Sequence, residues 1–209
     1  MTLGRIAFLG SGETSLAGGR IFESLARLIS DPLRVAIMET PAGFELNSAL
    51  VAGRVGDFFK TRLQNFKPVI DLIPARKRGS AFSPDDPEII KPLLYANLIF
   101  MGPGSPTYAI RQLKDTLAWD VIRARHRLGA TLVFASAATI SIGAHSLPVY
   151  EIYLVKPSDM NCLFPFRNTG SIARFFMMKA PLNRILFFCM QPRGLQNIGP
   201  KNIGWHLQN

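Results

Sequence analysis

The sequence alternates short apolar runs, rich in β-branched and aromatic residues, with longer amphipathic stretches through its first three quarters. Parallel strands joined by crossover helices produce this pattern. Several runs are apolar at every position, as strands covered on both faces of a parallel sheet are. The pattern predicts an α/β fold with a doubly wound, mainly parallel sheet and helices on both faces, of the flavodoxin-like class.

The expected elements follow from this alternation. We expect strands at Arg5 to Leu9, Arg34 to Met38, Pro68 to Ile73, Leu98 to Met101, Thr131 to Ala135 and Val149 to Val155. We expect helices at Gly19 to Ser30, Leu46 to Asn65, Pro87 to Tyr95, Thr107 to Leu128 and Ala137 to Gly143. No internal repeat interrupts the series.

The length and composition favour a single core, because 209 residues of which 48% are hydrophobic suit one sizeable domain. We assign this α/β domain to residues 1–155. Residues 156–209 lack the alternation, contain one acidic residue and end in Asn/Gly/Pro-rich sequence, which predicts an irregular basic tail. Two explanations stay open: a frameshift or erroneous gene end near Leu154 to Pro157, or a divergent lineage with an irregular tail of its own.

The sequence predicts a cytoplasmic protein without a membrane partner. No apolar run approaches the roughly 20 residues that cross a bilayer, and the first residues lack the apolar centre of a signal peptide. Cys162 and Cys189 are the only cysteines, too few for a disulfide framework. No histidines and carboxylates have metal-ligand spacing, so we expect neither a metal nor another cofactor.

The formal net charge of +10 raises nucleic acid as a partner, because clustered Lys and Arg attract polyanions. The distribution of the charge weakens that inference. Residues 152–209 hold seven Lys and Arg against one acidic residue, so over half of the excess lies in the tail. The basic cluster at Ala75 to Gly79 is typical of a solvated loop. We therefore expect no nucleic-acid partner.

Four distinctive loops each follow an expected strand: GSGETS, ETPAGFELN, GPGSPTY and SAATIS. In an open parallel sheet the loops at the carboxyl ends of the strands gather into one crevice, where ligands bind. This coincidence indicates a site. Each loop also has a purely structural interpretation, since Gly and Pro mark any strand-to-helix turn.

The segment GATLVFASAATISIGAH combines a buried strand, Ser136 and small residues that open a helix. A nucleophile on such a turn is held clear of the sheet, and the backbone N–H of Ala137 is offered to a developing oxyanion. The alternative is that Ser136 only caps the helix. These residues do not decide between the two interpretations.

A second oxyanion donor could come from the backbone of Gly102 or Gly104, whose missing side chains permit close approach. Pro103 cannot donate. GSGETS could present backbone amides to an anion, but it is not the dinucleotide fingerprint and has no phosphate-loop Lys. Nucleotide binding therefore ranks low.

A serine nucleophile needs a base, and the chain has only His126, His145 and His206. His126 ends a helix that precedes a strand, so we expect it on the surface at the edge opposite the crevice. His145 follows the nucleophile helix and is a candidate base, although ending the helix is its structural alternative. His206 lies near the terminus of the tail.

Together AFLGSGETS, AIMETPAGFELNS, IFMGPGSPTYAI and LVFASAATISIGAHSLPVYEIY resemble the cyanophycinase and dipeptidase E group of serine peptidases, relatives of the class I glutamine amidotransferases. The resemblance spans Ile6 to about Val155. It places Ser136 at the nucleophile position, assigns one oxyanion amide to Ala137 and matches the second oxyanion loop to Gly102 to Ser105.

The resemblance implies hydrolysis of a peptide or isopeptide bond next to an acidic residue, through an acyl-enzyme and without a cofactor. The expected partner is a small peptide or a substrate containing an acidic amino acid, and a homodimer is one option for the assembly. Three departures bear on activity: Ala135 and Ala138 replace the usual Thr and Gly, a proline enters the second oxyanion loop, and no histidine lies between His145 and His206. A noncatalytic domain for a small acidic ligand, or a truncated product without activity, are the alternatives.

Overall fold

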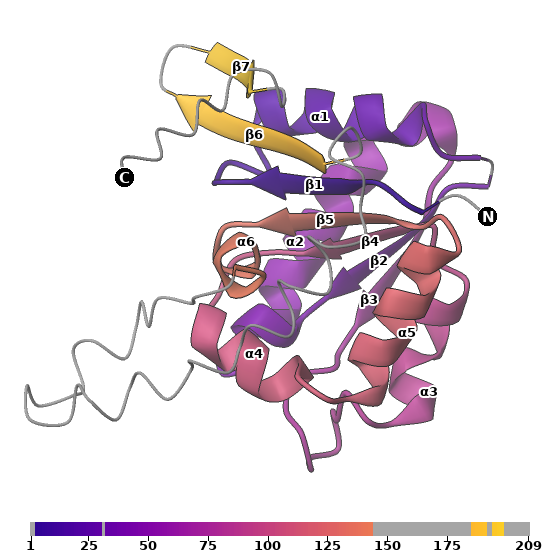
Figure 1. Ribbon diagram of the computed structural model, residues 1–209, viewed down its shortest axis with the longest axis vertical. Helices are drawn as coiled ribbons and strands as arrows, with labels where there is room; N and C mark the ends of the chain where they lie inside the picture. Colours follow the sequence, from indigo (N-terminus) through magenta and orange to yellow (C-terminus); the bar gives the residue numbers. More distant parts are fainter. Residues whose placement is uncertain (1–2, 31, 144–184, 192–193, 199–209) are drawn as a thin grey trace, which may run out of the picture.

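The structure, a computed structural model, describes residues 3–30, 32–143, 185–191 and 194–198. Its centre is a sheet of order β3-β2-β4-β5-β1-β6-β7, parallel except for the antiparallel pair β6–β7 (Figure 1). The strands are β1 Ile6–Leu9, β2 Arg34–Met38, β3 Val69–Ile73, β4 Leu98–Met101, β5 Thr131–Ala135, β6 Ile185–Gln191 and β7 Gly194–Ile198. The predicted doubly wound α/β class is confirmed.

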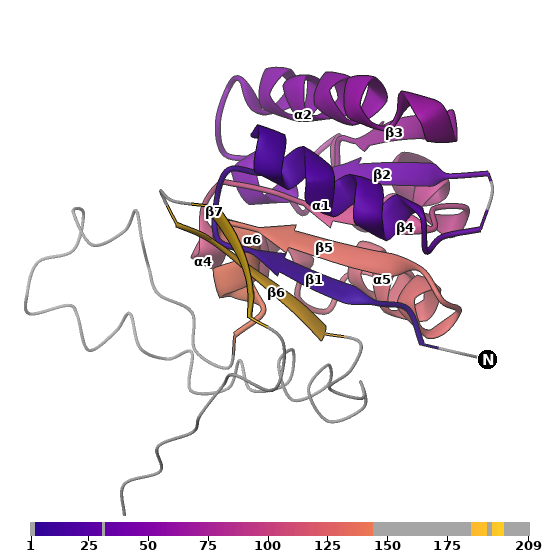
Figure 2. The same ribbon diagram turned by 90° about the horizontal axis from the view of Figure 1, so that it is seen from above.

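Helices cover both faces of this sheet. The helices are α1 Leu16–Ala26, α2 Ser48–Arg62, α3 Pro87–Ile90, α4 Pro106–Leu113, α5 Leu117–Arg127 and α6 Ala137–Ser141, with 3₁₀ turns at Thr40–Ala42, Gln64–Phe66 and Lys91–Leu94. Figure 2 shows α1 and α2 on one side of the sheet and α4, α5 and α6 on the other. The first five predicted strands are confirmed to within one residue. The sixth, at Val149 to Val155, lies outside the described residues.

The two faces are built by strict alternation along each strand, as the two-residue period of a strand requires. On β4, Leu98 and Phe100 face α1 and α2, whereas Ile99 and Met101 face the other helices. The first face is dominated by aromatic packing, with the ring centroids of Phe22 and Phe59 4.4 Å apart. Burying a side chain of this size stabilises the fold by about 1.5–3 kcal/mol.

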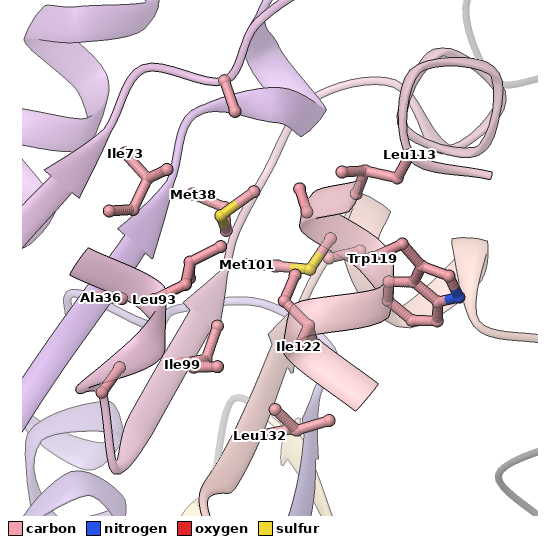
Figure 3. Close-up of a cluster of buried hydrophobic side chains, with 14 of the residues drawn as sticks. Ala36, Met38, Ile73, Leu93, Ile99, Met101, Leu113, Trp119, Ile122 and Leu132 are labelled. Atoms are coloured by element: carbon pink, nitrogen blue, oxygen red, sulfur yellow. The ribbon is translucent and has the colours of Figure 1, made fainter. Parts of the chain in front are cut away.

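The second face packs aliphatic and sulfur-containing side chains of the sheet against α5 and the Lys91–Leu94 turn (Figure 3). Its buried members include Met38, Met101, Trp119, Ile122 and Leu132. Because both faces are covered, the central strands are inaccessible along their length. Open loops are therefore confined to the two edges at which the strands begin and end.

The predicted helix at Thr107 to Leu128 is wrong as a single element, because it is two helices. Asp115 has φ +57°, which is incompatible with a right-handed helix, so the helical conformation is interrupted between α4 and α5. The next residue, Thr116, accepts a hydrogen bond from Trp119 N through its side chain and so begins α5. Thr is a favoured N-cap, and here capping outweighs the continuous amphipathic pattern.

The segment 156–209, which the sequence pattern left without regular elements, contains β6 and β7. β6 runs parallel to β1, with Ile6 opposite Ile185. The run from Ile185 to Met190 is apolar at every position, the signature of a covered strand, but it lacks the flanking turn and helix signals that identified the other strands.

Candidate active site

The four distinctive loops lie at one edge of the sheet, as expected. They follow β1, β2, β4 and β5, and these strands are neighbours in the order β2-β4-β5-β1. In Figure 1 this edge is on the left, where the arrowheads point and where α4 and α6 lie. The sheet therefore gathers Ser136, the Gly102–Ser105 loop and the segment after Leu9 in one region.

Ser136 lies between β5 and α6 with φ +52° and ψ −117°. This combination is outside the regions that L-residues ordinarily occupy, and it costs on the order of 1–3 kcal/mol. The backbone N–H of Ser136 donates to the carbonyl oxygen of Leu9 at 3.0 Å. Such a sharp, strained strand-to-helix turn is the geometry of a nucleophile elbow.

The Ser136 side chain does not cap α6, so the capping interpretation is wrong for this serine. The residue is half-buried, and no described residue forms a hydrogen bond with its hydroxyl. Its role is therefore not explained by local helix stability. Together with the strained backbone, this supports a functional role for the hydroxyl rather than a role in packing.

Thr139 fixes the elbow from the first turn of α6. Its Oγ1 lies 2.8 Å from both the Leu9 and the Phe134 carbonyl oxygens, which belong to β1 and β5. A hydroxyl has one proton to donate, so it shares or alternates between these two acceptors. Sequence reasoning did not single out Thr139. Its position in the SAATIS loop carried no signal that distinguishes it from an ordinary helix residue.

The start of α6 provides a free backbone donor. No described residue accepts a hydrogen bond from the N–H of Ala137, whereas that of Ala138 donates to the Gly102 carbonyl oxygen at 3.4 Å. The first N–H groups of a helix have no partner within the helix, and they favour negative charge. The N–H of Ala137 is thus available to an anion, and the Gly102–Ser105 loop contacts the start of α6 through the Ala138 bond.

The Gly102–Ser105 loop is held by the turn after β2. Gly104 has φ +145°, and a side chain there would overlap the carbonyl group of Pro41. Ser105 donates its N–H to that same carbonyl at 2.8 Å and caps α4 through its hydroxyl. Among the described residues none accepts from the N–H of Gly102 or Gly104. Both remain available as second oxyanion donors.

An ion pair with a buried carboxylate lies near this loop. Glu39, at the end of β2, has a side chain that is 3% exposed, and its Oε2 lies 2.6 Å from Nε of Arg76. Ser48 also donates to this carboxylate at 3.4 Å. A small cavity of about 20 Å³ is bordered by both Glu39 and Gly102. Sequence reasoning identified this loop but not Glu39 or its partner, because they are 37 residues apart.

The histidines do not complete the site within the described residues. His126 lies in α5 at the opposite edge, as expected, but its predicted surface exposure is wrong because it is 4% exposed. The start of the chain covers it: Gly4 donates its N–H to the His126 carbonyl oxygen at 2.8 Å. His145 and His206 lie outside the described residues.

A metal site needs a cluster of ligands, and a membrane span needs a long apolar helix. Over residues 3–30 and 32–143 no three His, Cys, Asp or Glu side chains are grouped so as to hold a metal ion. In the described residues no helix has both the length and the apolar character to span a membrane.

Comparison with known proteins identifies the fold. No protein-family model and no curated protein matches the sequence. A crystal structure of a peptidase from an acI-B1 actinobacterium superposes with a TM-score of 0.61 at 17% identity, over 90% of this chain and 80% of that one. A candidate peptidase E from Listeria monocytogenes EGD-e gives 0.46 at 14% identity, over 93% and 98%. The chain therefore shares its α/β fold with the actinobacterial peptidase.

Proposed function

We propose that this chain is a serine-type, peptidase-like hydrolase with Ser136 as its nucleophile. The observation that carries the proposal is the backbone of Ser136, with φ +52° and ψ −117° between a buried strand and a helix. A strained conformation persists only where the surrounding structure enforces it, and such residues concentrate at functional sites. Ser136 is one of three non-glycine residues with positive φ in the described part of the chain.

The environment of Ser136 suits acyl transfer. Its hydroxyl oxygen would attack a substrate carbonyl, and the negative charge on the carbonyl oxygen would be met by the N–H of Ala137 and that of Gly102 or Gly104. Removing one donor of this kind costs an enzyme about 10²–10³ in kcat. Collapse of the tetrahedral intermediate would break the C–N bond, and the amine would leave with the proton taken from the serine. Water would then hydrolyse the serine ester, releasing the acid and regenerating the free hydroxyl.

The reaction also needs a base to accept the serine proton, and His145 is our proposed candidate. It lies four residues after Ser141, the last residue of α6, in the sequence. His126 does not serve, since it is buried at the opposite edge of the sheet. A general base must come within hydrogen-bond reach of the proton that it removes, which is about 2.6–3.2 Å between heavy atoms.

The substrate class is proposed from the sequence resemblance to the cyanophycinase and dipeptidase E group. We propose cleavage of a peptide or isopeptide bond beside an acidic residue. The likeness of the fold to a solved peptidase supports the reaction class as an analogy of architecture.

Labelling with a serine-directed fluorophosphonate, followed by mass mapping, tests the proposal. We expect a label on Ser136 in the folded chain, none in Ser136→Ala, and full labelling in Ser80→Ala, which changes an exposed loop serine. His145→Ala should slow the labelling strongly. An unlabelled Ser136 in folded protein would overturn the hydrolase and favour a noncatalytic binding domain or an inactive product.

A further inference from the structure

A second hollow lies at the opposite edge of the sheet, where the strands begin. It has a volume of about 490 Å³, within the range of small-molecule sites. Its lining comes from the start of the chain, the α1–β2 connection, the residues before β4 and the α5–β5 connection. In Figure 1 this edge is on the right, beside the label of the N-terminus. The hollow is thus separated from the Ser136 region by the length of the strands.

Three arginines, Arg5, Arg34 and Arg125, line the hollow, and no described acidic side chain does. None of the three forms an ion pair with a described carboxylate, whereas Arg62, Arg76, Arg78 and Arg123 each do. Asp31, between two lining residues in the sequence, lies outside the described residues. The described lining residues carry a formal charge of +3, from these three arginines.

Two of the three arginines, Arg5 and Arg125, are held in place by bonds to backbone carbonyl oxygens. Nε and Nη2 of Arg125 donate to the Ala96 carbonyl oxygen at 3.0 and 2.9 Å, and Arg5 Nη1 lies 3.4 Å from the Leu28 carbonyl oxygen. These bonds leave other N–H groups of each guanidinium for a ligand, since each guanidinium carries five donors. Arg34 is exposed and has no described side-chain partner.

Asn97 organises the rim around these arginines. Its Oδ1 accepts from the backbone N–H of Arg34 at 2.8 Å, and its Nδ2 donates to the carbonyl oxygens of Ser30 and Pro32. One side chain thus ties the α1–β2 connection to the start of β4. The start of β2, which carries Arg34, is thereby fixed against the residues before β4, to which Arg125 is also bonded through the Ala96 carbonyl oxygen. This arrangement exists before any ligand binds, which lowers the ordering cost of binding.

We propose that this hollow binds a small phosphate-bearing anion. Guanidinium groups match phosphate oxygens in geometry and charge, and several of them around one concave site favour a multiply charged ligand over a monoanion. The exposed ring of Tyr95 borders the same hollow and offers a face to an organic part of the ligand. The site is independent of the proposed hydrolase activity.

Calorimetric titration of the full chain with inorganic pyrophosphate tests this site. We expect saturable 1:1 binding that weakens about tenfold or more in Arg34→Glu, because a charge-assisted hydrogen bond is lost and a repulsion is introduced. Arg54→Glu makes the same change of charge on an exposed residue of α2 that does not line the hollow. That control should change the affinity by less than about twofold.

Two results would overturn the proposal. One is the absence of saturable binding to the parent chain. The other is an equal weakening in Arg54→Glu and Arg34→Glu, which would attribute binding to the overall positive charge. Arg34→Ala is a milder variant that removes the charge without reversing it. Its unfolding midpoint should match that of the parent chain, because Arg34 is exposed and its hydrogen bond to Asn97 involves only the backbone N–H.

Discussion

The backbone N–H of Ser136 donates to the carbonyl oxygen of Leu9 at 3.0 Å, which ties the turn after β5 to the end of β1. Thr139 contacts the same carbonyl from α6. One main-chain oxygen of a neighbouring strand thus holds both the strained residue and the helix that follows it. The elbow is therefore a product of the sheet order, in which β1 lies beside β5.

Relief of strain at Ser136 is the first prediction. Ser136→Gly should raise the free energy of unfolding by about 1 kcal/mol relative to Ser136→Ala, because glycine adopts positive φ without steric cost. Ser136→Ala is the matched control, since it keeps the Cβ atom and loses the hydroxyl. Urea unfolding measures both variants. Equal stabilities would mean that the backbone at this position is not strained.

Gly104→Ala should destabilise the chain by about 1–3 kcal/mol, because alanine disfavours φ +145° and its methyl group would overlap the Pro41 carbonyl. Gly53→Ala is the control, as a side chain in that part of α2 would enter open space. It should be neutral or stabilise by up to about 1 kcal/mol, the gain in helix propensity. Denaturant midpoints distinguish the two, and a neutral Gly104→Ala would contradict the close approach of the two loops.

Arg76→Ala should cost about 3–5 kcal/mol of unfolding free energy, because it leaves the buried Glu39 carboxylate without its charged partner. The double variant Arg76→Ala with Glu39→Gln should recover part of this loss. Lys91→Ala breaks the exposed pair with Glu88 and should change stability by less than about 1 kcal/mol. Similar losses of unfolding free energy in Arg76→Ala and Lys91→Ala would argue against a buried carboxylate at Glu39.

Thr139→Val should lower stability by about 1 kcal/mol, the usual worth of a lost hydrogen bond in a side chain of the same shape. It should also slow fluorophosphonate labelling of Ser136, because the start of α6 loses its tie to β1 and β5. Ser24→Ala removes an exposed hydroxyl bond on α1 and serves as the control for labelling. Unchanged labelling in Thr139→Val would show that this threonine does not position the elbow.

Burial raises the pKa of Tyr108 above its ordinary value of 10.0. The hydroxyl also donates to the Arg76 carbonyl oxygen at 3.0 Å. Above pH 10 the unfolded chain therefore releases this proton first, so stability is lost as the pH rises from about 10 through the folded-state pKa. Tyr108→Phe should show a shallower alkaline loss in unfolding measurements at a series of pH values. The parent chain supplies the reference slope, and equal slopes in the two proteins would contradict a raised pKa at Tyr108.

Local pattern determined much of the architecture. Runs such as Val35 to Met38 and Thr131–Ala135 specify strands because every residue is apolar or β-branched and turn signals surround them. The positions of four distinctive loops after strands were enough to predict one crevice, since parallel strands end at a common edge. Ser136, Ala137, Gly102 and Gly104 were accordingly named from the sequence as candidates.

Tertiary structure decided the backbone strain, the ion pairing and the burial, because each depends on residues that are far apart in the sequence. The strain at Ser136 exists because β1 supplies the Leu9 carbonyl across more than 120 residues of sequence, and the Glu39–Arg76 pair forms only when β2 and the loop after β3 meet. The burial of His126 likewise needs the start of the chain to pack against α5. Sequence patterns report the periodicity of one segment, whereas backbone strain, ion pairing and burial are set by contacts between segments that only the folded chain brings together.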